Sequence, residues 1–172
     1  MEIELEKTYL LQYIPEDLKD HDNVEIFDIY VPKSQQHPNL RIRKRGEIAE
    51  ITKKFPVDSK DISEQEEHTI PLLEEEFQAF TKVEGKKIRK IRYFYPIDGN
   101  IAEISIFLDE LKGLAMVDVE FKTKEEKEKF EMPEFCLADV TQELYFAGGI
   151  LAGKKYLDIE PVLDKYSYKK II

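Results

Sequence analysis

The opening stretch MEIELEKTYLL, residues 1–11, alternates charged and apolar side chains along most of its length. Successive side chains of a β-strand point to opposite faces, so Glu2, Glu4 and Glu6 share one face of the predicted strand. Such a row is either a solvated acidic surface, where water screens the repulsion, or a wall of carboxylates that binds cations. Hard divalent metals such as Mg²⁺ and Mn²⁺ prefer carboxylate oxygens, so a metal site is one of the two interpretations.

Similar alternation predicts about eight strands in the chain. Besides the opening strand, strands are expected at 23–33, in the two arms of a hairpin within 39–55, and at 62–70, 86–97, 101–108 and 115–121. Helices are expected at 15–22, 71–82, 124–130 and 158–168, the third opened by a capping box of Thr123 and Glu126, whereas Gly148 and Gly149 should break any helix. The pattern predicts an α+β fold dominated by β-structure, as a single antiparallel barrel or a strongly curved sheet.

The composition favours one soluble domain spanning residues 1–172. The chain is 42% hydrophobic and 11% aromatic, which is enough for a core, and it has neither an apolar run of transmembrane length nor a recognisable signal peptide. Its single cysteine, Cys136, has no partner for an internal disulfide and no metal-ligand spacing around it, so we expect a buried thiol and a cytoplasmic location. The net charge of −10 argues against nucleic-acid binding, and no membrane partner is expected.

Because alternate residues of a strand share a face, the other charged residues fall into sets that share faces. The sets are Arg41 with Arg43 and Arg45, Glu50 with Thr52 and Lys54, Glu64 with Glu66 and His68, Lys90 with Arg92, Glu103 with Ser105, and Asp118 with Glu120. In an ordinary sheet these faces would meet water while the apolar faces pack on a core. In a closed barrel they would turn inward around a wet lumen, where a phosphate chain with a divalent metal would balance both signs of charge. The residues alone leave both architectures open.

An ordered series of motifs runs along nearly the whole chain. The motifs are EIELEKTYLL, NLRIRKR, EITKKF, SEQEEHTIPL, KIRKIRYFY, AEISIFLDELKGL, MVDVEF and DVTQELYF. Their succession and spacing resemble the CYTH family, also called the triphosphate tunnel metalloenzymes, whose members open with a Glu-x-Glu-x-Lys strand and continue with Arg-rich, Lys-bearing and Glu-x-Glu strands. The resemblance implies an eight-stranded antiparallel closed barrel with a charged lumen, which binds a triphosphate with Mg²⁺ or Mn²⁺, and with helices packed outside.

The resemblance also implies roles for individual positions. The implied metal ligands are Glu4, Glu6 and Glu120, with Asp118 near a second metal. The implied phosphate ligands are Arg41, Arg43, Lys54, Lys90 and Arg92, and Glu64 with Glu66 matches the acidic pair of the middle strand that faces the substrate. Glu4, Glu6 and Lys54 are the implied catalytic residues.

The implied activity is metal-dependent hydrolysis of a small triphosphate, in which the metals hold the substrate and help to activate the water that attacks the terminal phosphorus. Inorganic triphosphate is the expected substrate, because short family members of simple architecture commonly use it. Thiamine triphosphate and nucleoside triphosphates are alternatives, and a class IV adenylate cyclase uses the same barrel to cyclise ATP. No residue in the sequence marks an adenine or thiamine pocket.

Two positions depart from the family pattern. Thr8 stands where the opening motif has its lysine, and Ser105 stands where many members carry a metal-binding aspartate, for which Glu103 or Asp109 could substitute. A missing lysine should weaken phosphate binding or slow the chemistry. These departures motivate a rival hypothesis of another class, a tunnel that binds polyphosphate or a nucleotide without efficient turnover.

Four other charged residues are expected outside the lumen. Arg89 and Lys53 have the wrong parity, Arg45 lies near the hairpin turn, and His68 is expected to be a surface or hydrogen-bonding residue. The outer apolar faces could be covered by the chain's own helices or by a second subunit, so a monomer and a homodimer both remain open.

Overall fold

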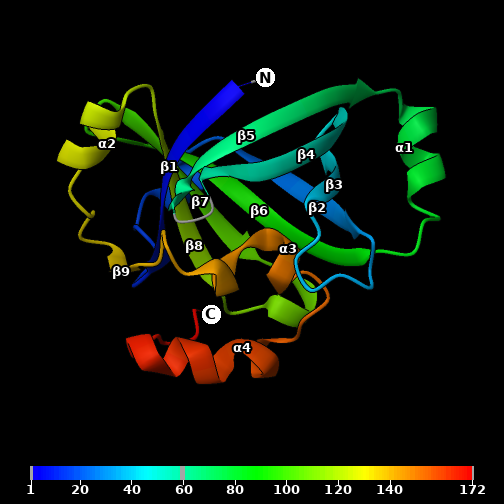
Figure 1. The fold of residues 1–172 in the computed structure, drawn as a ribbon. Coiled ribbons are helices and arrows are strands. Elements are labelled where there is room, and N and C mark those ends of the chain that lie inside the picture. Colours follow the sequence, from blue (N-terminus) through cyan, green and yellow to red (C-terminus); the bar gives the residue numbers. More distant parts are fainter. Residues whose placement is uncertain (1, 59–60, 172) are drawn as a thin grey trace.

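The described residues of the computed structural model, 2–58 and 61–171, form a closed antiparallel β-barrel (Figure 1). The strands are β1 (Glu2–Leu11), β2 (Asn23–Val31), β3 (Leu40–Arg45), β4 (Ile48–Asp58), β5 (Asp61–Leu72), β6 (Lys86–Ile97), β7 (Asn100–Phe107), β8 (Ala115–Phe121) and β9 (Cys136–Asp139). Their order in the sheet is β5-β4-β3-β2-β6-β7-β8-β1-β9, and an additional pairing of β5 with β1 closes the barrel. The expected eight-stranded closed barrel is therefore confirmed.

Strand β1 is the point of closure. One of its edges pairs with β8 from Leu5 to Leu10, and the other edge pairs first with β5 from Glu2 to Leu5 and then with β9 from Tyr9 to Leu11. The ninth strand, β9, was not expected from the sequence because it is only four residues long. It covers the part of the β1 edge that β5 leaves unpaired, which would otherwise expose free backbone groups.

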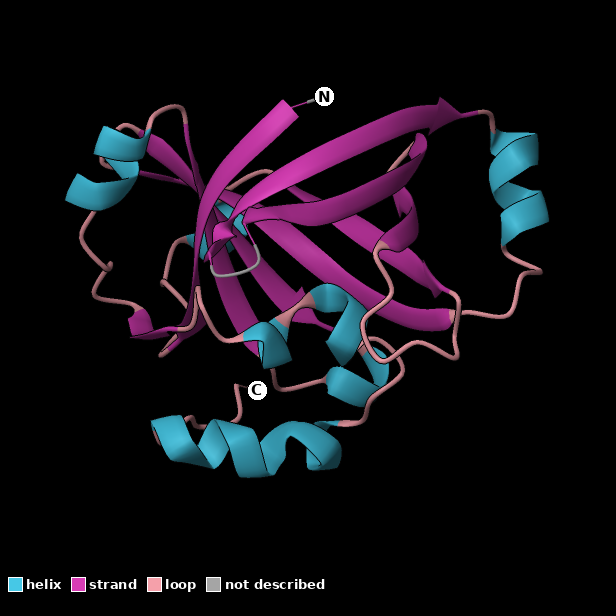
Figure 2. Ribbon diagram, in the orientation of Figure 1, coloured by secondary structure: helices cyan, strands magenta, loops and turns pink. Residues whose placement is uncertain are grey.

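The helices are short and lie outside the strands (Figure 2). The α-helices are α1 (Glu74–Phe80), α2 (Lys124–Lys129), α3 (Gly148–Leu151) and α4 (Tyr156–Leu163), and the 3₁₀ turns are η1 (Leu18–Asp20), η2 (Asp109–Leu111), η3 (Leu144–Phe146) and η4 (Asp164–Tyr166). No helix of the described part of the chain is long and apolar enough to span a membrane.

Three of the helical expectations need correction. The helix expected at 15–22 is reduced to the single turn η1, and α1 begins at Glu74 because Pro71 and Leu72 still pair with β4. The glycines expected to break a helix, Gly148 and Gly149, instead form the first turn of α3.

The capping box that opens α2 is confirmed. The backbone N–H of Glu126 donates to Thr123 Oγ1 at 3.2 Å, and the Glu126 carboxylate accepts from the Thr123 N–H at 3.3 Å. The buried thiol is confirmed as well, since Cys136 is 3% exposed and burial, with Asp139 nearby, raises its pKa to about 12. A thiol of that pKa stays protonated and unreactive at neutral pH.

Apolar side chains cover two outer faces of the barrel. The outward residues of β2, β3 and β4 pack against Phe77 of α1, and those of β1, β7 and β8 pack against Phe135, Cys136 and the η1 residue Leu18. Residues that alternate with these along each strand therefore point into the lumen. The charged faces of the strands thus line the interior of the barrel, and the apolar faces point outward to the helices and loops that cover them.

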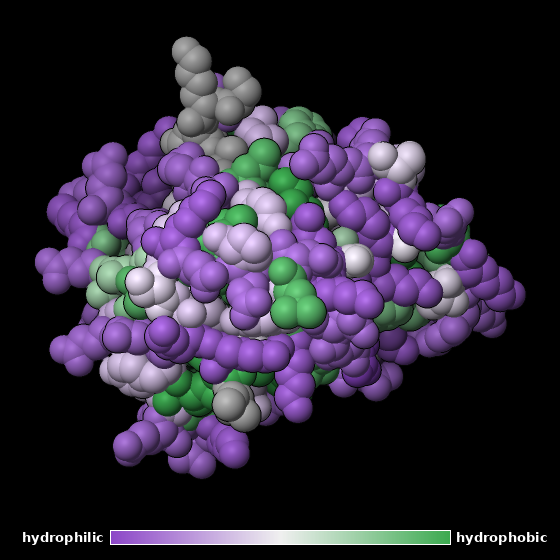
Figure 3. Space-filling view, turned by 90° about the horizontal axis from the view of Figure 1, so that it is seen from below, coloured by the Kyte–Doolittle hydropathy of each residue, from purple (hydrophilic) through white to green (hydrophobic). Residues whose placement is uncertain are grey.

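A third apolar cluster closes one end of the lumen. Inward-pointing Tyr30, Ile88, Phe107 and Met116 meet Val140, Phe146 and Leu151 from the C-terminal segment, and the cluster continues to Ile159 and Leu163 of α4. Figure 1 shows α3 and α4 stacked beneath the barrel. From this side the molecular surface is mostly hydrophilic, with separate apolar patches (Figure 3). The charged part of the lumen thus ends on an apolar plug instead of running straight through.

Candidate functional site

A cavity of about 430 Å³ occupies the charged part of the lumen and receives side chains from all eight barrel strands. The structure brings nine of the predicted site residues together there: Glu4, Glu6, Arg41, Arg43, Lys54, Lys90, Arg92, Asp118 and Glu120. Arg45, which was expected outside, also lines this cavity. The expected surface position of Arg89 is confirmed, because its guanidinium binds Asp109 and Glu25 in exposed ion pairs.

The expectation that Glu64 and Glu66 face the substrate is wrong. Glu64 forms an ion pair with Lys124 of α2 at 2.7 Å, and Glu66 contacts His68 at 2.9 Å, both outside the lumen. Gln65 and Glu67 line the cavity in their place. The cause is the register of the hairpin, since Lys54 pairs directly with Glu67 and paired residues share a face.

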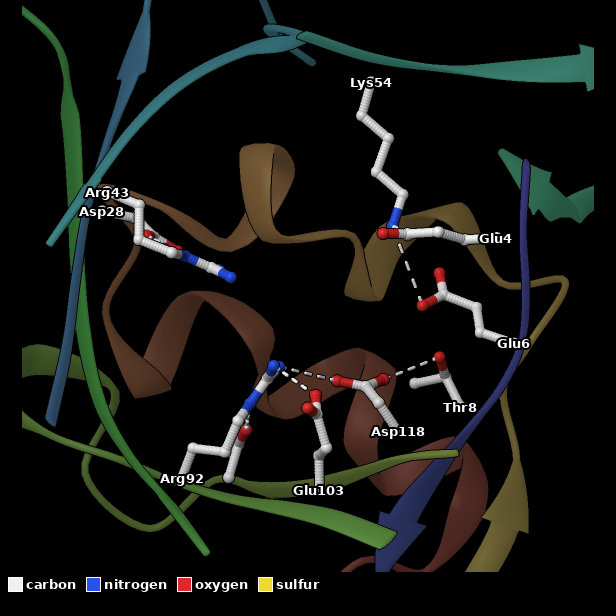
Figure 4. Close-up of polar contacts among 10 residues, drawn as sticks. Glu4, Glu6, Thr8, Asp28, Arg43, Lys54, Arg92, Glu103 and Asp118 are labelled. Atoms are coloured by element: carbon white, nitrogen blue, oxygen red, sulfur yellow. Dashed lines mark hydrogen bonds and ion pairs between the residues drawn. The ribbon is translucent and has the colours of Figure 1, made fainter. Parts of the chain in front are cut away.

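Carboxylates from β1 and β8 form one wall of the cavity. Glu6 and Glu120 are direct partners across these two strands, and Glu4 lies one position further along the same face. The ammonium of Lys54 reaches across from β4, contacting Glu4 closely and lying 3.8 Å from Glu6 Oε2 (Figure 4). One ammonium group therefore contacts two of the three carboxylates.

The pKa values of this wall reflect the burial and the crowding of its carboxylates. Burial raises the pKa of Glu6, and although Lys54 lowers it, Asp118 and Glu4 act in the same direction as burial. Burial also raises the pKa of Glu120, to about 7, with Glu103, Glu4 and Glu6 adding to the effect. Both shifts mean that the wall gains free energy from any additional cation.

Arg92 of β6 gathers a second acidic group beside that wall. Its guanidinium contacts Glu103 closely through Nη1 and Asp118 Oδ2 at 3.3 Å through Nη2, while Nε approaches Ser105 Oγ at 3.5 Å. Thr8 donates from Oγ1 to the other oxygen of Asp118 at 2.9 Å. Both departures from the family motif, Thr8 and Ser105, therefore make contacts within this group.

The opposite wall is basic and is organised by a buried aspartate. Arg43 donates from Nε and Nη2 to the two oxygens of Asp28 at 2.7 and 2.8 Å. Burial would raise the pKa of Asp28, but Arg43 outweighs it and holds the pKa at about 2. Asp28 was not among the predicted site residues, although a charge between Phe27 and Ile29 in an apolar strand was a usable signal. This pair fixes Arg43 and leaves its Nη1 group for a ligand.

Two other cations of the basic wall lack full partners. The Nε atom of Arg41 is buried and makes no hydrogen bond within the described residues. Burial, reinforced by neighbouring Arg92, lowers the pKa of Lys90 to about 7, and its ammonium lies 5.4 Å from the centre of the Phe107 ring. Donors left unsatisfied in this way are available to an anion that enters the cavity.

The rim of the cavity is built from the β2–β3 loop and the start of α3. Lys86 Nζ donates to the carbonyl oxygens of Gln36 at 2.7 Å and of Gly149 at 2.6 Å, and so ties these two segments together. The approach is close: a Cβ added at Gly149 would lie 2.7 Å from the Pro38 carbonyl oxygen. This close approach leaves no room for a side chain at Gly149.

The model of the CYTH domain matches residues 5–148, which are most of the barrel and the beginning of α3. The chain belongs to the CYTH family.

Known relatives agree with this CYTH assignment. An inorganic triphosphatase of Nitrosomonas europaea is 24% identical over 151 residues, covering 87% of this chain and 96% of that protein. The crystal structure of the inorganic triphosphatase NE1496 superposes with a TM-score of 0.65 at 22% identity, covering 90% of this chain and 97% of that one. The PH1012 protein of Pyrococcus horikoshii OT3 gives a TM-score of 0.51 at 17% identity, covering 97% and 92%. The solved structures establish the shared fold.

The acidic wall of this CYTH protein suits a hard divalent cation by its donor chemistry. In the described residues no three carboxylate, imidazole or thiol groups are placed as a ready metal site, and the ammonium of Lys54 lies between the carboxylates of Glu4 and Glu6. The donors are nevertheless all carboxylate oxygens, and the pKa values of Glu6 and Glu120 are raised by burial first and by the neighbouring carboxylates second. Glu4, Glu6 and Glu120 are the residues that fit such an ion.

Proposed function

We propose that this CYTH protein hydrolyses inorganic triphosphate with the help of Mg²⁺ or Mn²⁺. The observation that carries the proposal is the division of one cavity into an acidic wall around Glu6 and a basic wall around Arg43. A triphosphate with a bound divalent ion is complementary to both walls at once. Similarity to an inorganic triphosphatase supports the same activity.

The residues of the basic wall bind and orient the substrate. Arg43, held by Asp28, presents its remaining guanidinium donors in a fixed direction, and Arg41, Lys90 and Arg92 add further donors for phosphoryl oxygens. Lys54, between the two walls, donates to the phosphoryl group nearest the carboxylates. Fixed donors stabilise the charge that develops on a transferring phosphoryl group without reorganising during the reaction.

The carboxylates of Glu4, Glu6 and Glu120 would hold the divalent ion, whose chemistry is Lewis-acid stabilisation of phosphoryl charge and help in activating the attacking water. The catalytic role expected for Glu4, Glu6 and Lys54 is retained in this proposal.

The apolar plug favours an unsubstituted phosphate chain. Phe107, Met116 and Phe146 close the lumen immediately beside the charged residues, and the rim is tight around Gly149. A nucleoside or thiamine group would have to displace these contacts, so hydrolysis of nucleoside triphosphates or thiamine triphosphate and cyclisation of ATP are less favoured alternatives. We further propose that residues 1–172 form one domain that acts in the cytoplasm.

Thr8 favours a second candidate, a tunnel that binds polyphosphate or a nucleotide without turnover, because it replaces a lysine of the family motif. The deciding assay measures phosphate release from inorganic triphosphate, ATP and thiamine triphosphate with Mg²⁺, with Mn²⁺ and with excess chelator. Metal-dependent release that is fastest with inorganic triphosphate is the expected result. Thermal stabilisation by these anions without any release would refute hydrolysis and support the binding module.

Two glutamates provide a matched pair of variants for that assay. Glu67→Gln removes a carboxylate that lines the cavity, whereas Glu66→Gln removes its neighbour, whose carboxylate contacts His68 outside the barrel. Only Glu67→Gln should change the rate or the Michaelis constant. An equal effect of Glu66→Gln would contradict the placement of the reaction inside the lumen.

A further inference from the structure

The register of three strands divides the carboxylates of the cavity into two groups. Glu6 lies directly opposite Glu120, and two residues further along the same strand pair Thr8 lies opposite Asp118. Asp118 in turn lies opposite Glu103 of β7. Glu4, Glu6 and Glu120 therefore form one group, and Asp118 with Glu103 forms a second group one step deeper in the lumen.

Asp118 has both of its oxygens engaged. Oδ1 accepts a hydrogen bond from Thr8 Oγ1 at 2.9 Å, and Oδ2 accepts from Arg92 Nη2 at 3.3 Å. Glu103 contacts the same guanidinium through Nη1. Arg92, whose side chain is 11% exposed, is thus held by carboxylates from two strands, β7 and β8.

The two groups differ in how their charge is balanced. The first has Glu4, Glu6 and Glu120, with Glu67 of β5 beside Glu4, for the single ammonium of Lys54, and Glu120 makes no hydrogen bond or ion pair among the described residues. The second has two carboxylates for one permanently charged guanidinium, and it receives the hydroxyl of Thr8 besides. The second group is the more nearly balanced of the two, and both of its carboxylates are bound to the guanidinium. Lys54 has a flexible stem, whereas the planar donors of Arg92 are fixed by their partners.

We propose that Thr8 is a positioning residue that fixes Asp118 against Arg92, so that Asp118 and Glu103 orient a phosphate-binding guanidinium and do not bind metal. The acidic wall then has one cation position, at Glu4, Glu6 and Glu120. In this protein the threonine in place of the motif lysine holds the arginine in its binding orientation. The proposal rests on the proposed function for the identity of the anion, inorganic triphosphate.

The test measures metal binding and anion binding separately, with no turnover required. Binding of Mn²⁺ is counted by electron paramagnetic resonance, and binding of tripolyphosphate is measured by calorimetry in the presence of chelator. The variants are Thr8→Val, which removes the hydroxyl while keeping the shape, and Thr8→Ser, which keeps the hydroxyl. Because the hydroxyl donates to a charged group, its loss should weaken tripolyphosphate binding about fivefold to tenfold.

The expected pattern is one Mn²⁺ per chain in the parent, weaker tripolyphosphate binding in Thr8→Val with Mn²⁺ affinity changed less than about twofold, and recovery of anion binding in Thr8→Ser. Two Mn²⁺ ions per chain, or a Thr8→Val variant that loses Mn²⁺ affinity and keeps anion affinity, would overturn the proposal. An unchanged Thr8→Val variant would overturn it as well. A parent that binds Mn²⁺ but no tripolyphosphate would instead refute the proposed function, and the Mn²⁺ count would still decide the number of cation positions.

Discussion

The buried ion pair between Asp28 and Arg43 should make a large contribution to the stability of the barrel. Asp28 is 2% exposed and Arg43 is 8% exposed, and two hydrogen bonds join them. Replacing Asp28 with asparagine keeps the size of the side chain but leaves the guanidinium buried without its counter-charge. Removing one partner of a buried pair costs about 3–5 kcal/mol of unfolding free energy.

The pKa of Asp28 gives an independent estimate of the same quantity. The pKa is about 2 in the folded protein and 3.8 ordinarily, and this separation multiplied by 2.303RT is about 2.5 kcal/mol. Asparagine resembles the protonated carboxyl, so this value is the lower bound for Asp28→Asn. We therefore expect the variant to lose about 3 kcal/mol at pH 7.

The sign of the pH dependence follows from the lowered pKa. The stabilisation by Asp28 is fully present above pH 3.8 and is lost as the pH falls toward 2. About half of it should be gone at pH 3. The difference in unfolding free energy between the parent and Asp28→Asn should shrink accordingly, which urea titrations at pH 7, 4 and 3 would measure.

A second aspartate supplies the control. Asp109 accepts the same kind of bidentate pair of hydrogen bonds, from Nε of Arg89 at 2.8 Å and from its Nη2 at 3.0 Å, but on the exposed surface. Asp109→Asn should leave the unfolding free energy nearly unchanged, because solvent screens an exposed pair. Equal losses in the two variants, or a loss in Asp28→Asn that does not vary between pH 7 and 3, would refute the reasoning.

Three further predictions concern the cavity. Glu6→Gln should raise the melting temperature of the metal-free protein, because it relieves repulsion from Glu4 and Asp118. It should also weaken Mn²⁺ binding at least about tenfold, as measured by the Mn²⁺-induced shift in melting temperature. An undiminished shift would show that Glu6 is not a metal ligand. Lys90→Met should stabilise the ligand-free fold, because the pKa of Lys90 is lowered from 10.5 to about 7 and its buried ammonium therefore reduces the unfolding free energy, most below pH 7 and less as the pH rises. The difference in unfolding free energy between the variant and the parent should shrink by about 2 kcal/mol between pH 7 and 9. A difference that does not change with pH would contradict a buried charge at Lys90. Lys86→Met should loosen the rim of the cavity, because Lys86 joins its two segments by hydrogen bonds. Amide hydrogen exchange should become faster in residues 32–39 and 147–149, while exchange in the barrel strands stays unchanged. Unaltered exchange at the rim would show that other contacts hold it.

The alternation of side chains determined much of this protein in advance. The strands at 86–97 and 115–121 begin and end where the sequence predicted, because alternating apolar residues between turn signals leave little choice of structure. The predicted placement of Glu4, Glu6, Arg43 and Lys54 on shared faces also follows directly from the two-residue period of a strand.

The same period does not say which face of a strand turns inward, and here tertiary structure decided. Glu66 and Glu67 are adjacent, and only the pairing of Glu67 with Lys54 across the hairpin places Glu67, and not Glu66, in the lumen. A shift of one residue in that hairpin would exchange the two faces at no cost in local conformation. The pairing of Glu4 with Gln65, where β5 closes against β1, places the same face of β5 inward.

The contacts that give the site its properties were likewise invisible in the sequence. Asp28 lies fifteen positions from Arg43, and Thr8 lies 110 positions from Asp118. Such pairs depend on which strands the barrel makes neighbours, and a charge pattern along the chain cannot supply that. The sequence therefore determined that charged faces exist and what they could bind, while closure of the barrel decided which of those charges meet, because the free energy of pairing distant strands is a property of the whole sheet.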